Sequence, residues 1–222
     1  MFRRSVIKVA LWTPVALFPV AMAGCAAAGF VAQAIPQSVK AEYPGLAGQK
    51  VAVMVWADRG ARIDFPNLQL DTANQIQADL ASQVKDKSEL AKTEFPWEAR
   101  SVLRFQKEHP EVEMMPVTSY AQRISGITRL IYVEVSDFST RNDVAVQLLR
   151  GSMGGNVKVV EITNGVSKIV YERSNIRVTF PEKSPDGVIN VSEDKIYAGT
   201  VTSFADTVSK LFYGYVVERD TH

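Results

Sequence analysis

The spacing of apolar residues divides the chain into three parts. Residues 9–22 form one apolar run, residues 26–45 are rich in alanine without a sustained period, and regular patterns begin at Lys50. Strict alternation of apolar residues indicates a strand, and apolar residues three and four positions apart indicate a helix. We therefore expect one structured domain, residues 47–222, behind an apolar amino terminus.

The domain is predicted to begin with a strand and two helices. Residues 51–56 are apolar without interruption, as in a strand buried on both faces, and we expect the first, central strand of a sheet there. Apolar residues then recur at helical spacing over residues 70–85, which predicts a helix packed on that sheet. Pro96 suits a first helical turn and Pro110 ends a helix, so a second helix is expected between them, over residues 97–109.

The next stretch carries shorter elements. A short strand is expected over residues 112–115, and a brief helix over residues 118–124, with Gly126 at its left-handed exit. Residues 130–138 then alternate, with Tyr132 and Glu134 on the wetter face. That alternation predicts a strand with one face in the core.

A hairpin is the clearest local signal in the second half. Residues 157–162 and 166–172 are rich in strand-forming residues, and Asn164-Gly165 between them favours a type I′ turn, because both of its central positions accept positive φ. Residues 176–180 alternate again and either continue that strand or add another. A last helix is expected to begin as early as Ser192 and to end near Gly214.

The order strand, helix, helix, strand, hairpin, helix predicts the fold class. It is typical of an α/β domain in which a mixed β-sheet is packed with helices. The sheet should be parallel near the first strand and antiparallel at the hairpin.

The amino terminus has the layout of an export signal. Arg3, Arg4 and Lys8 form a positive region, the apolar run of residues 9–22 follows, and small residues precede Cys25. Met22-Ala23-Gly24-Cys25 resembles the lipobox of bacterial lipoproteins. The resemblance implies cleavage after a signal peptide of residues 1–24, acyl chains on Cys25, and a lipidated tether over residues 25–46.

Three alternatives remain open in this region. Cys25 could instead be a small buried residue of an ordinary apolar helix. Arg3-Arg4 with Lys8 also resembles the twin-arginine export motif, which implies folding before transport, whereas paired arginines are common in any export signal. Residues 26–45 could be an extra edge segment packed on the domain instead of a tether.

The domain itself resembles a group of envelope proteins over residues 48–213. The matching features are residues 50–53 before a long helix, residues 131–135 after a helix ending at Gly126, and the Asn164-Gly165 hairpin before a last helix. They resemble the amino-terminal domain of TolB and the curli-secretion and penicillin-binding-protein-activator lipoproteins. Lipopolysaccharide-assembly lipoproteins have a similar outline, but the insertion over residues 88–115 suits them less well.

Composition and charge narrow the functional classes. The chain has 46% hydrophobic and 22% charged residues, which is ordinary for a globular protein. Cleavage after residue 24 would remove three of the 25 basic residues and none of the 24 acidic ones, leaving a net charge near −2. We therefore expect no nucleic-acid partner. The single cysteine excludes an intrachain disulfide.

Residues suited to catalysis are few, and we expect no enzymatic activity, no metal and no cofactor. His109 and His222, the only histidines, lack the spacing of zinc ligands, and His109 is expected to be solvated or capping. The glycine-rich residues 151–155 lack the ending of a phosphate loop and are expected to form a flexible connection. Trp56, Trp97 and Phe105 are expected in the core.

One candidate contact site follows the first strand. Asp58, Arg59, Arg62 and Asp64 cluster where open α/β sheets keep their binding crevice. The alternative is a solvated loop of mixed charge.

These features lead to three functional hypotheses. The first is a non-enzymatic accessory lipoprotein that binds other envelope proteins through a sheet edge or helix face. Relatives of this type often assemble into rings, so the resemblance leaves self-association open, although no sequence feature demonstrates it. Ala26 after the cysteine, in place of aspartate, resembles the pattern sorted to the outer membrane, with the domain facing the periplasm. The second is a carrier of a small molecule or lipid, and the third is an enzyme of unfamiliar type.

Overall fold

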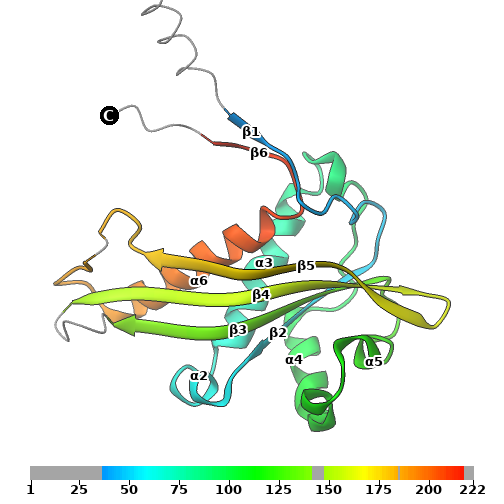
Figure 1. The fold of residues 1–222 in the computed structure, drawn as a ribbon, viewed down its shortest axis with the longest axis horizontal. Helices are drawn as coiled ribbons and strands as arrows, with labels where there is room; N and C mark the ends of the chain where they lie inside the picture. Colours follow the sequence, from blue (N-terminus) through cyan, green and yellow to red (C-terminus); the bar gives the residue numbers. More distant parts are fainter. Residues whose placement is uncertain (1–36, 142–147, 185, 218–222) are drawn as a thin grey trace, which may run out of the picture. The chain divides into compact units, whose positions relative to one another are not determined.

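The computed structural model describes residues 37–141, 148–184 and 186–217. Its centre is a four-stranded sheet (Figure 1). The strands, in their order across the sheet, are β2 (Val51–Ala57), β3 (Arg129–Arg141), β4 (Leu149–Thr163) and β5 (Val166–Phe180). The pair β2 and β3 is parallel and the other two pairs are antiparallel, which confirms the predicted mixed sheet.

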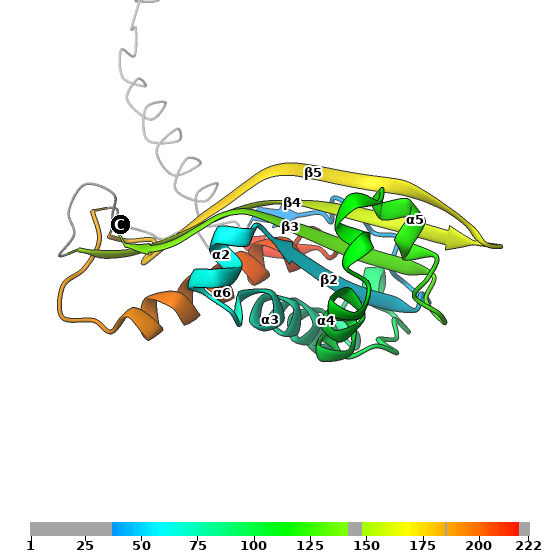
Figure 2. The same ribbon diagram turned by 90° about the horizontal axis from the view of Figure 1, so that it is seen from below.

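Helices lie on both faces of this sheet (Figure 2). The two long helices, α3 (Leu68–Gln83) and α6 (Glu193–Ser209), contact each other and cover one face. The shorter α4 (Ala99–Glu108) and α5 (Val117–Ala121) pack with a second apolar cluster on the other face. Both long helices and α4 lie close to their predicted positions.

Short elements complete the described chain. The short helix α2 (Arg59–Asp64) follows β2, and the 3-10 helix η2 (Pro110–Met114) follows α4. A second 3-10 helix, η1 (Ser88–Leu90), lies between α3 and α4. The short strands β1 (Gln37–Val39) and β6 (Tyr215–Val217) pair with each other outside the main sheet. Residues 112–115 were expected to form a strand, but residues 112–114 belong to η2 and pair with no strand of the described sheets.

Alternation along β2 divides the core into two clusters. Val51, Val53 and Val55 face α3 and α6, whereas Ala52 and Met54 face the second cluster. All five are buried, as the uninterrupted apolar run predicts. The expected central position is wrong, because β2 lies at the edge of the sheet. Helices and loops next to that edge supply the burial that a second neighbouring strand would give.

The hairpin is confirmed at the predicted residues. Asn164 and Gly165 join β4 to β5 with φ of 52° and 76°, the positive values that a type I′ turn needs. β5 continues to Phe180, so the alternation near its end belongs to the same strand. The pairing of β4 with β5 shifts register near Gly155 and near Val159, as at β-bulges.

The glycine-rich residues 151–155 do not form a flexible connection. They lie within β4, and Gly151 and Gly155 are buried. A Cβ atom on Gly155 would stand 2.6 Å from the Glu134 carbonyl oxygen and 3.0 Å from the Phe204 ring. Glycine therefore allows β3, β4 and α6 to approach one another closely.

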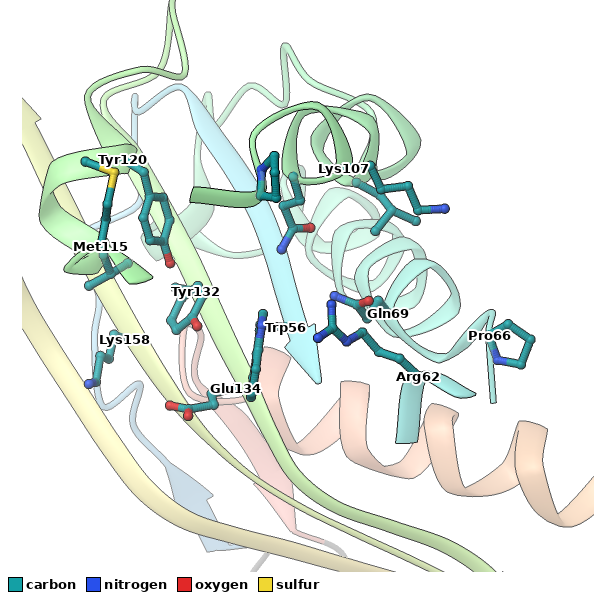
Figure 3. A pocket seen from close by; sticks show the side chains of 14 residues that line it. Trp56, Arg62, Pro66, Gln69, Lys107, Met115, Tyr120, Tyr132, Glu134 and Lys158 are labelled. Atoms are coloured by element: carbon teal, nitrogen blue, oxygen red, sulfur yellow. The ribbon is translucent and has the colours of Figure 1, made fainter. Parts of the chain in front are cut away.

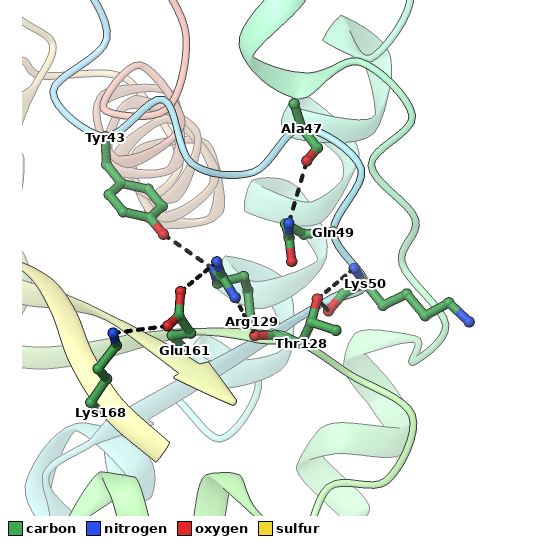
Figure 4. Close-up of polar contacts among 8 residues, drawn as sticks. All are labelled: Tyr43, Ala47, Gln49, Lys50, Thr128, Arg129, Glu161 and Lys168. Carbon is green, nitrogen blue, oxygen red and sulfur yellow. Dashed lines mark hydrogen bonds and ion pairs between the residues drawn. The ribbon is translucent and has the colours of Figure 1, made fainter. Parts of the chain in front are cut away.

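Part of the segment expected to form the tether packs on the domain. Leu46 is fully buried, and Tyr43 packs against the main core. The Tyr43 hydroxyl accepts a hydrogen bond of 3.2 Å from Nε of Arg129, and Arg129 pairs with Glu161 at 2.6 Å (Figure 4). The expected signal peptide, Cys25 and the part of the expected tether up to residue 36 lie outside the described residues. Within the described ranges, no helix is both long and apolar enough to cross a membrane.

Candidate functional site

A pocket of about 630 Å³ lies on the second face of the sheet, beside the carboxyl end of β2 (Figure 3). We call it the aromatic pocket. Its floor consists of side chains from three neighbouring strands, and its walls come from α2, α3, α4, η2 and α5. The floor residues are Trp56, Tyr132, Glu134 and Lys158, and the wall residues are Arg62, Pro66, Gln69, Leu103, Gln106, Lys107, Pro110, Met115, Val117 and Tyr120.

Strand register brings the floor residues together. Trp56 on β2 lies opposite Glu134 on β3, and Tyr132 on β3 lies opposite Lys158 on β4. Tyr132 and Glu134 are two positions apart, so both point to the same face. The four side chains therefore form two cross-strand pairs that are offset by one strand, and each pair sets an aromatic ring beside a charged group.

Two glutamines fix the wall nearest the edge of the sheet. Nε2 of Gln69 on α3 and Nε2 of Gln106 on α4 donate to the Val55 carbonyl, at 2.8 and 3.2 Å. This carbonyl belongs to an edge strand, which would otherwise leave it unpaired. The hydrogen bonds hold α3 and α4 in place along this wall.

Tyr120 closes the opposite wall and remains neutral. Its side chain is 2% exposed, and its ring packs 6.0 Å from that of Tyr132. Burial raises the pKa of Tyr120 strongly, and the adjacent Tyr132 and Glu134 act in the same direction. The pocket therefore keeps a protonated hydroxyl at this position across the physiological range.

Charged groups of both signs line the pocket. The Arg62 guanidinium lies over the Trp56 ring, with its central carbon 5.7 Å from the ring centroid. Lys158 pairs at 3.4 Å with Glu172, which does not line the pocket. Glu134 is half-buried and lies opposite Trp56, two positions along β3 from Tyr132.

Of the four residues expected to form a contact site, only Arg62 lines this pocket. Asp58 caps α2, since its Oδ1 accepts a 2.7 Å hydrogen bond from the backbone N–H of Ala61. Arg59 and Asp64 are exposed. The expected crevice therefore lies near the correct strand end, but the mixed-charge segment is a capped helix that contributes one side chain to it.

None of the four residues on the pocket floor was among the residues expected to form a contact site. Trp56, expected in the core, is only partly buried and lines the pocket, whereas Trp97 and Phe105 pack in the second cluster. Tyr132 and Glu134 were predicted on the wetter face of their strand, and that alternation was the available signal. Among the described residues, no group of three or more histidine, cysteine, aspartate or glutamate side chains could hold a metal. His109 ends α4 and lies 3.2 Å from Glu111.

Comparison with known proteins gives structural similarities only. No protein-family model matches the sequence, and no curated protein matches it. The solved structures that are similar to this chain include the following three, all at low sequence identity. A PelC dodecamer from Paraburkholderia phytofirmans has 12% identity and a TM-score of 0.43, covering 81% of this chain and 99% of that one. The lipoprotein GNA1162 from Neisseria meningitidis has 13% identity and a TM-score of 0.41, covering 72% and 95%. The hypothetical protein CT253 from Chlamydia trachomatis has 15% identity and a TM-score of 0.38, covering 72% and 98%.

Proposed function

We propose that this chain is a lipid-anchored accessory protein of the bacterial envelope, which binds other envelope proteins without catalysing a reaction. The observation that carries the proposal is the sequence Met22-Ala23-Gly24-Cys25 after a positive region and an apolar run. Each buried methylene of an acyl chain contributes about 0.8 kcal/mol, and two or more chains give stable attachment. Lipid on Cys25 would therefore hold the domain at a membrane.

The proposal includes a location and a fold family. Ala26 after the cysteine favours the outer membrane, with the domain facing the periplasm. The mixed sheet with its hairpin and last helix is compatible with a TolB amino-terminal-like domain.

Mass analysis of the native protein tests the anchor. We expect residues 1–24 to be absent and Cys25 to carry acyl chains. A Cys25→Ser variant should keep the signal peptide and lack the acyl chains. An unmodified thiol in the native protein, with residues 1–24 still attached, would refute the anchor.

Crosslinking in intact cells tests the partner class. The lipidated protein should crosslink to envelope proteins, and Cys25→Ser is the matched control that separates contact from mislocalisation. The same crosslinks record self-association, which the sequence resemblance implies. A correctly localised protein that crosslinks to no envelope protein would contradict the proposed function.

A second function, binding of a small ligand, is favoured by the aromatic pocket. Its volume of about 630 Å³ lies within the range of small-molecule sites. Native mass spectrometry of the purified protein should then show an additional bound mass. Release of that mass on unfolding, without a change in the protein's own mass, would separate a ligand from a covalent modification.

A further inference from the structure

Glu134 is a half-buried carboxylate of the aromatic pocket, and within the described part of the chain it forms no hydrogen bond or ion pair. It lies directly opposite Trp56, because β2 and β3 run parallel and pair these two residues. A carboxylate that has lost part of its hydration gains free energy from a positive charge placed beside it. Glu134 therefore marks a place in the pocket where a cation is favoured.

Aromatic rings border the same place. Neighbouring strands are about 4.8 Å apart and residues two positions apart on a strand about 6.6 Å, so the side chains of Trp56, Glu134 and Tyr132 start from adjacent points of the sheet. All three line the pocket (Figure 3). The face of an aromatic ring carries negative charge density and attracts cations. The two rings and the carboxylate therefore act in the same direction.

Trp56 already holds a cation of the chain itself on one of its faces. The central carbon of the Arg62 guanidinium lies 5.7 Å from the ring centroid, and Figure 3 shows Arg62 and Glu134 on opposite sides of the ring. The pocket lies on both sides, since Gln69 lines it beside Arg62 and Tyr132 lines it beside Glu134. A second cation can therefore meet the face of Trp56 that is turned towards Glu134.

The two lysines of the pocket are directed elsewhere. Nζ of Lys158 lies 3.4 Å from Oε1 of Glu172, which is outside the pocket. Lys107 is exposed, and Figure 3 shows its ammonium group pointing away from the Trp56 ring. Neither lysine forms an ion pair with Glu134, so the space beside Trp56 keeps its negative group.

Hydrogen-bonding capacity selects the type of cation. A primary ammonium group has three N–H donors, whereas the side chains around this face of Trp56 offer one carboxylate, that of Glu134. Donors that are buried without acceptors cost free energy. A quaternary ammonium group has no N–H donor, and its methyl groups present a positively charged C–H surface that packs on aromatic rings.

We propose that the aromatic pocket binds a quaternary ammonium group, with its methyl groups on Trp56 and Tyr132 and its charge beside Glu134. This inference rests on the second function proposed above, binding of a small ligand, and is independent of the lipid anchor. The group can come from a free compound such as choline or from the headgroup of a choline lipid.

Calorimetric titration of the full chain, purified in an uncharged maltoside detergent, tests this proposal. The probes are choline, ethanolamine as the primary ammonium analogue, and 3,3-dimethylbutan-1-ol as the neutral molecule of the same shape as choline. We expect saturable binding of choline, about tenfold tighter than binding of the other two, as one partly desolvated contact between a cation and an aromatic ring predicts. This comparison uses the native chain and depends on no variant.

Glycerophosphocholine, the headgroup part of a choline lipid, separates the two sources of the ligand. Tighter binding than that of choline identifies a lipid headgroup, because contacts with the phosphate and glycerol then add to those of the ammonium group. Equal or weaker binding identifies the free cation.

Two carboxylates on the same strand locate the binding. Glu134→Gln should weaken choline binding about tenfold and change binding of the neutral alcohol less than twofold. Asp137→Asn is the matched control, since Asp137 lies on β3 outside the pocket, and it should change choline binding less than twofold. Glu134→Gln should also unfold at the same urea concentration as the native chain, because Glu134 has no described partner to lose. Trp56→Phe keeps an aromatic face and should bind choline more tightly than Trp56→Leu.

Three results would overturn the inference: no saturable binding of choline, binding of ethanolamine or the neutral alcohol as tight as that of choline, or equal losses in Glu134→Gln and Asp137→Asn. A different co-purified ligand seen by native mass spectrometry would overturn it too, while leaving the second proposed function intact. Absence of any bound mass, together with absence of choline binding, would contradict both.

Discussion

Gln69 and Gln106, from two different helices, donate hydrogen bonds to the same backbone carbonyl, that of Val55. Val55 is fully enclosed although β2 is an edge strand. Edge strands expose unpaired backbone groups that can pair with other chains. At this position, two side-chain amides take the place of a neighbouring strand.

Replacing both glutamines should destabilise the domain. In Gln69→Ala/Gln106→Ala the Val55 carbonyl stays buried without a partner, which costs about 1–3 kcal/mol. Urea unfolding should show a lower free energy of unfolding for this variant. Gln75→Ala is the control, because the Gln75 amide bonds only locally, to Asp79 on the same helix. Equal losses in the two variants would show that the Val55 contact is unimportant.

Stability should fall in acid as Glu161 becomes protonated. The hydrogen bond from Lys168 lowers the pKa of Glu161 below its ordinary value of 4.5, and the charge of Arg129 acts in the same direction. A carboxyl whose pKa is lowered by folding stabilises the folded state above its unfolded pKa. That contribution is lost as pH falls from about 4.5 through the lower folded value.

The check is the melting temperature measured between pH 6 and pH 3. Glu161→Gln should flatten the acid limb of the curve, whereas Glu182→Gln, at an exposed loop position, should leave it unchanged. An acid limb in Glu161→Gln identical to that of the native protein would contradict the assignment.

Alanine should be tolerated differently at two adjacent glycines. The Gly155 Cβ would meet backbone at Glu134 and the buried Phe204 ring, neither of which can move freely. The Gly154 Cβ would meet the end of the Asp137 side chain, which can rotate away. Overpacking of this kind costs about 1–3 kcal/mol. Gly155→Ala should therefore unfold at a lower urea concentration than Gly154→Ala, and the reverse order would be inconsistent with the packing described.

Asp58 should matter for stability and not for ligand binding. Loss of a helix cap costs about 1 kcal/mol, so Asp58→Ala should lower the free energy of unfolding and Asp58→Ser should largely restore it. Neither should change the amount of ligand that native mass spectrometry finds bound, because Asp58 does not line the pocket. Asp64→Ala, at an exposed position, serves as the control. Weakened binding in a folded Asp58→Ser variant would restore a direct role for this residue.

The sequence predicts most elements here because their signals are local. Three features that depend only on neighbouring residues appear in the structure. They are the Asn164-Gly165 turn, the helix cap at Ser192, and the helix predicted from apolar residues three and four positions apart up to Leu80. The edge position of β2 was missed because Gln69 and Gln106 complete the burial from far along the chain. Gly155 was misassigned because its close contacts with Glu134 and Phe204 are likewise distant in sequence.

The candidate site was predictable only in part, for a related reason. A strand's alternation shows which side chains share a face, and it placed Tyr132 and Glu134 correctly together. It does not show which part of that face the helices leave uncovered. Trp56 therefore looked like a core residue, although α4 and α5 cover its neighbour Met54 and leave Trp56 partly open.

The packing of Tyr43 and Leu46 sets a limit on how far the amino-terminal side can be trimmed. Leu46 is fully buried, and the Tyr43 ring packs at a tilt against Tyr171 and edge to face against Phe212. A shortened chain that starts at residue 38 keeps both side chains, whereas one that starts at residue 47 lacks them and leaves two cavities in the core. Emptying a buried leucine site alone costs about 2–5 kcal/mol, which is enough to turn a soluble fragment into an aggregating one.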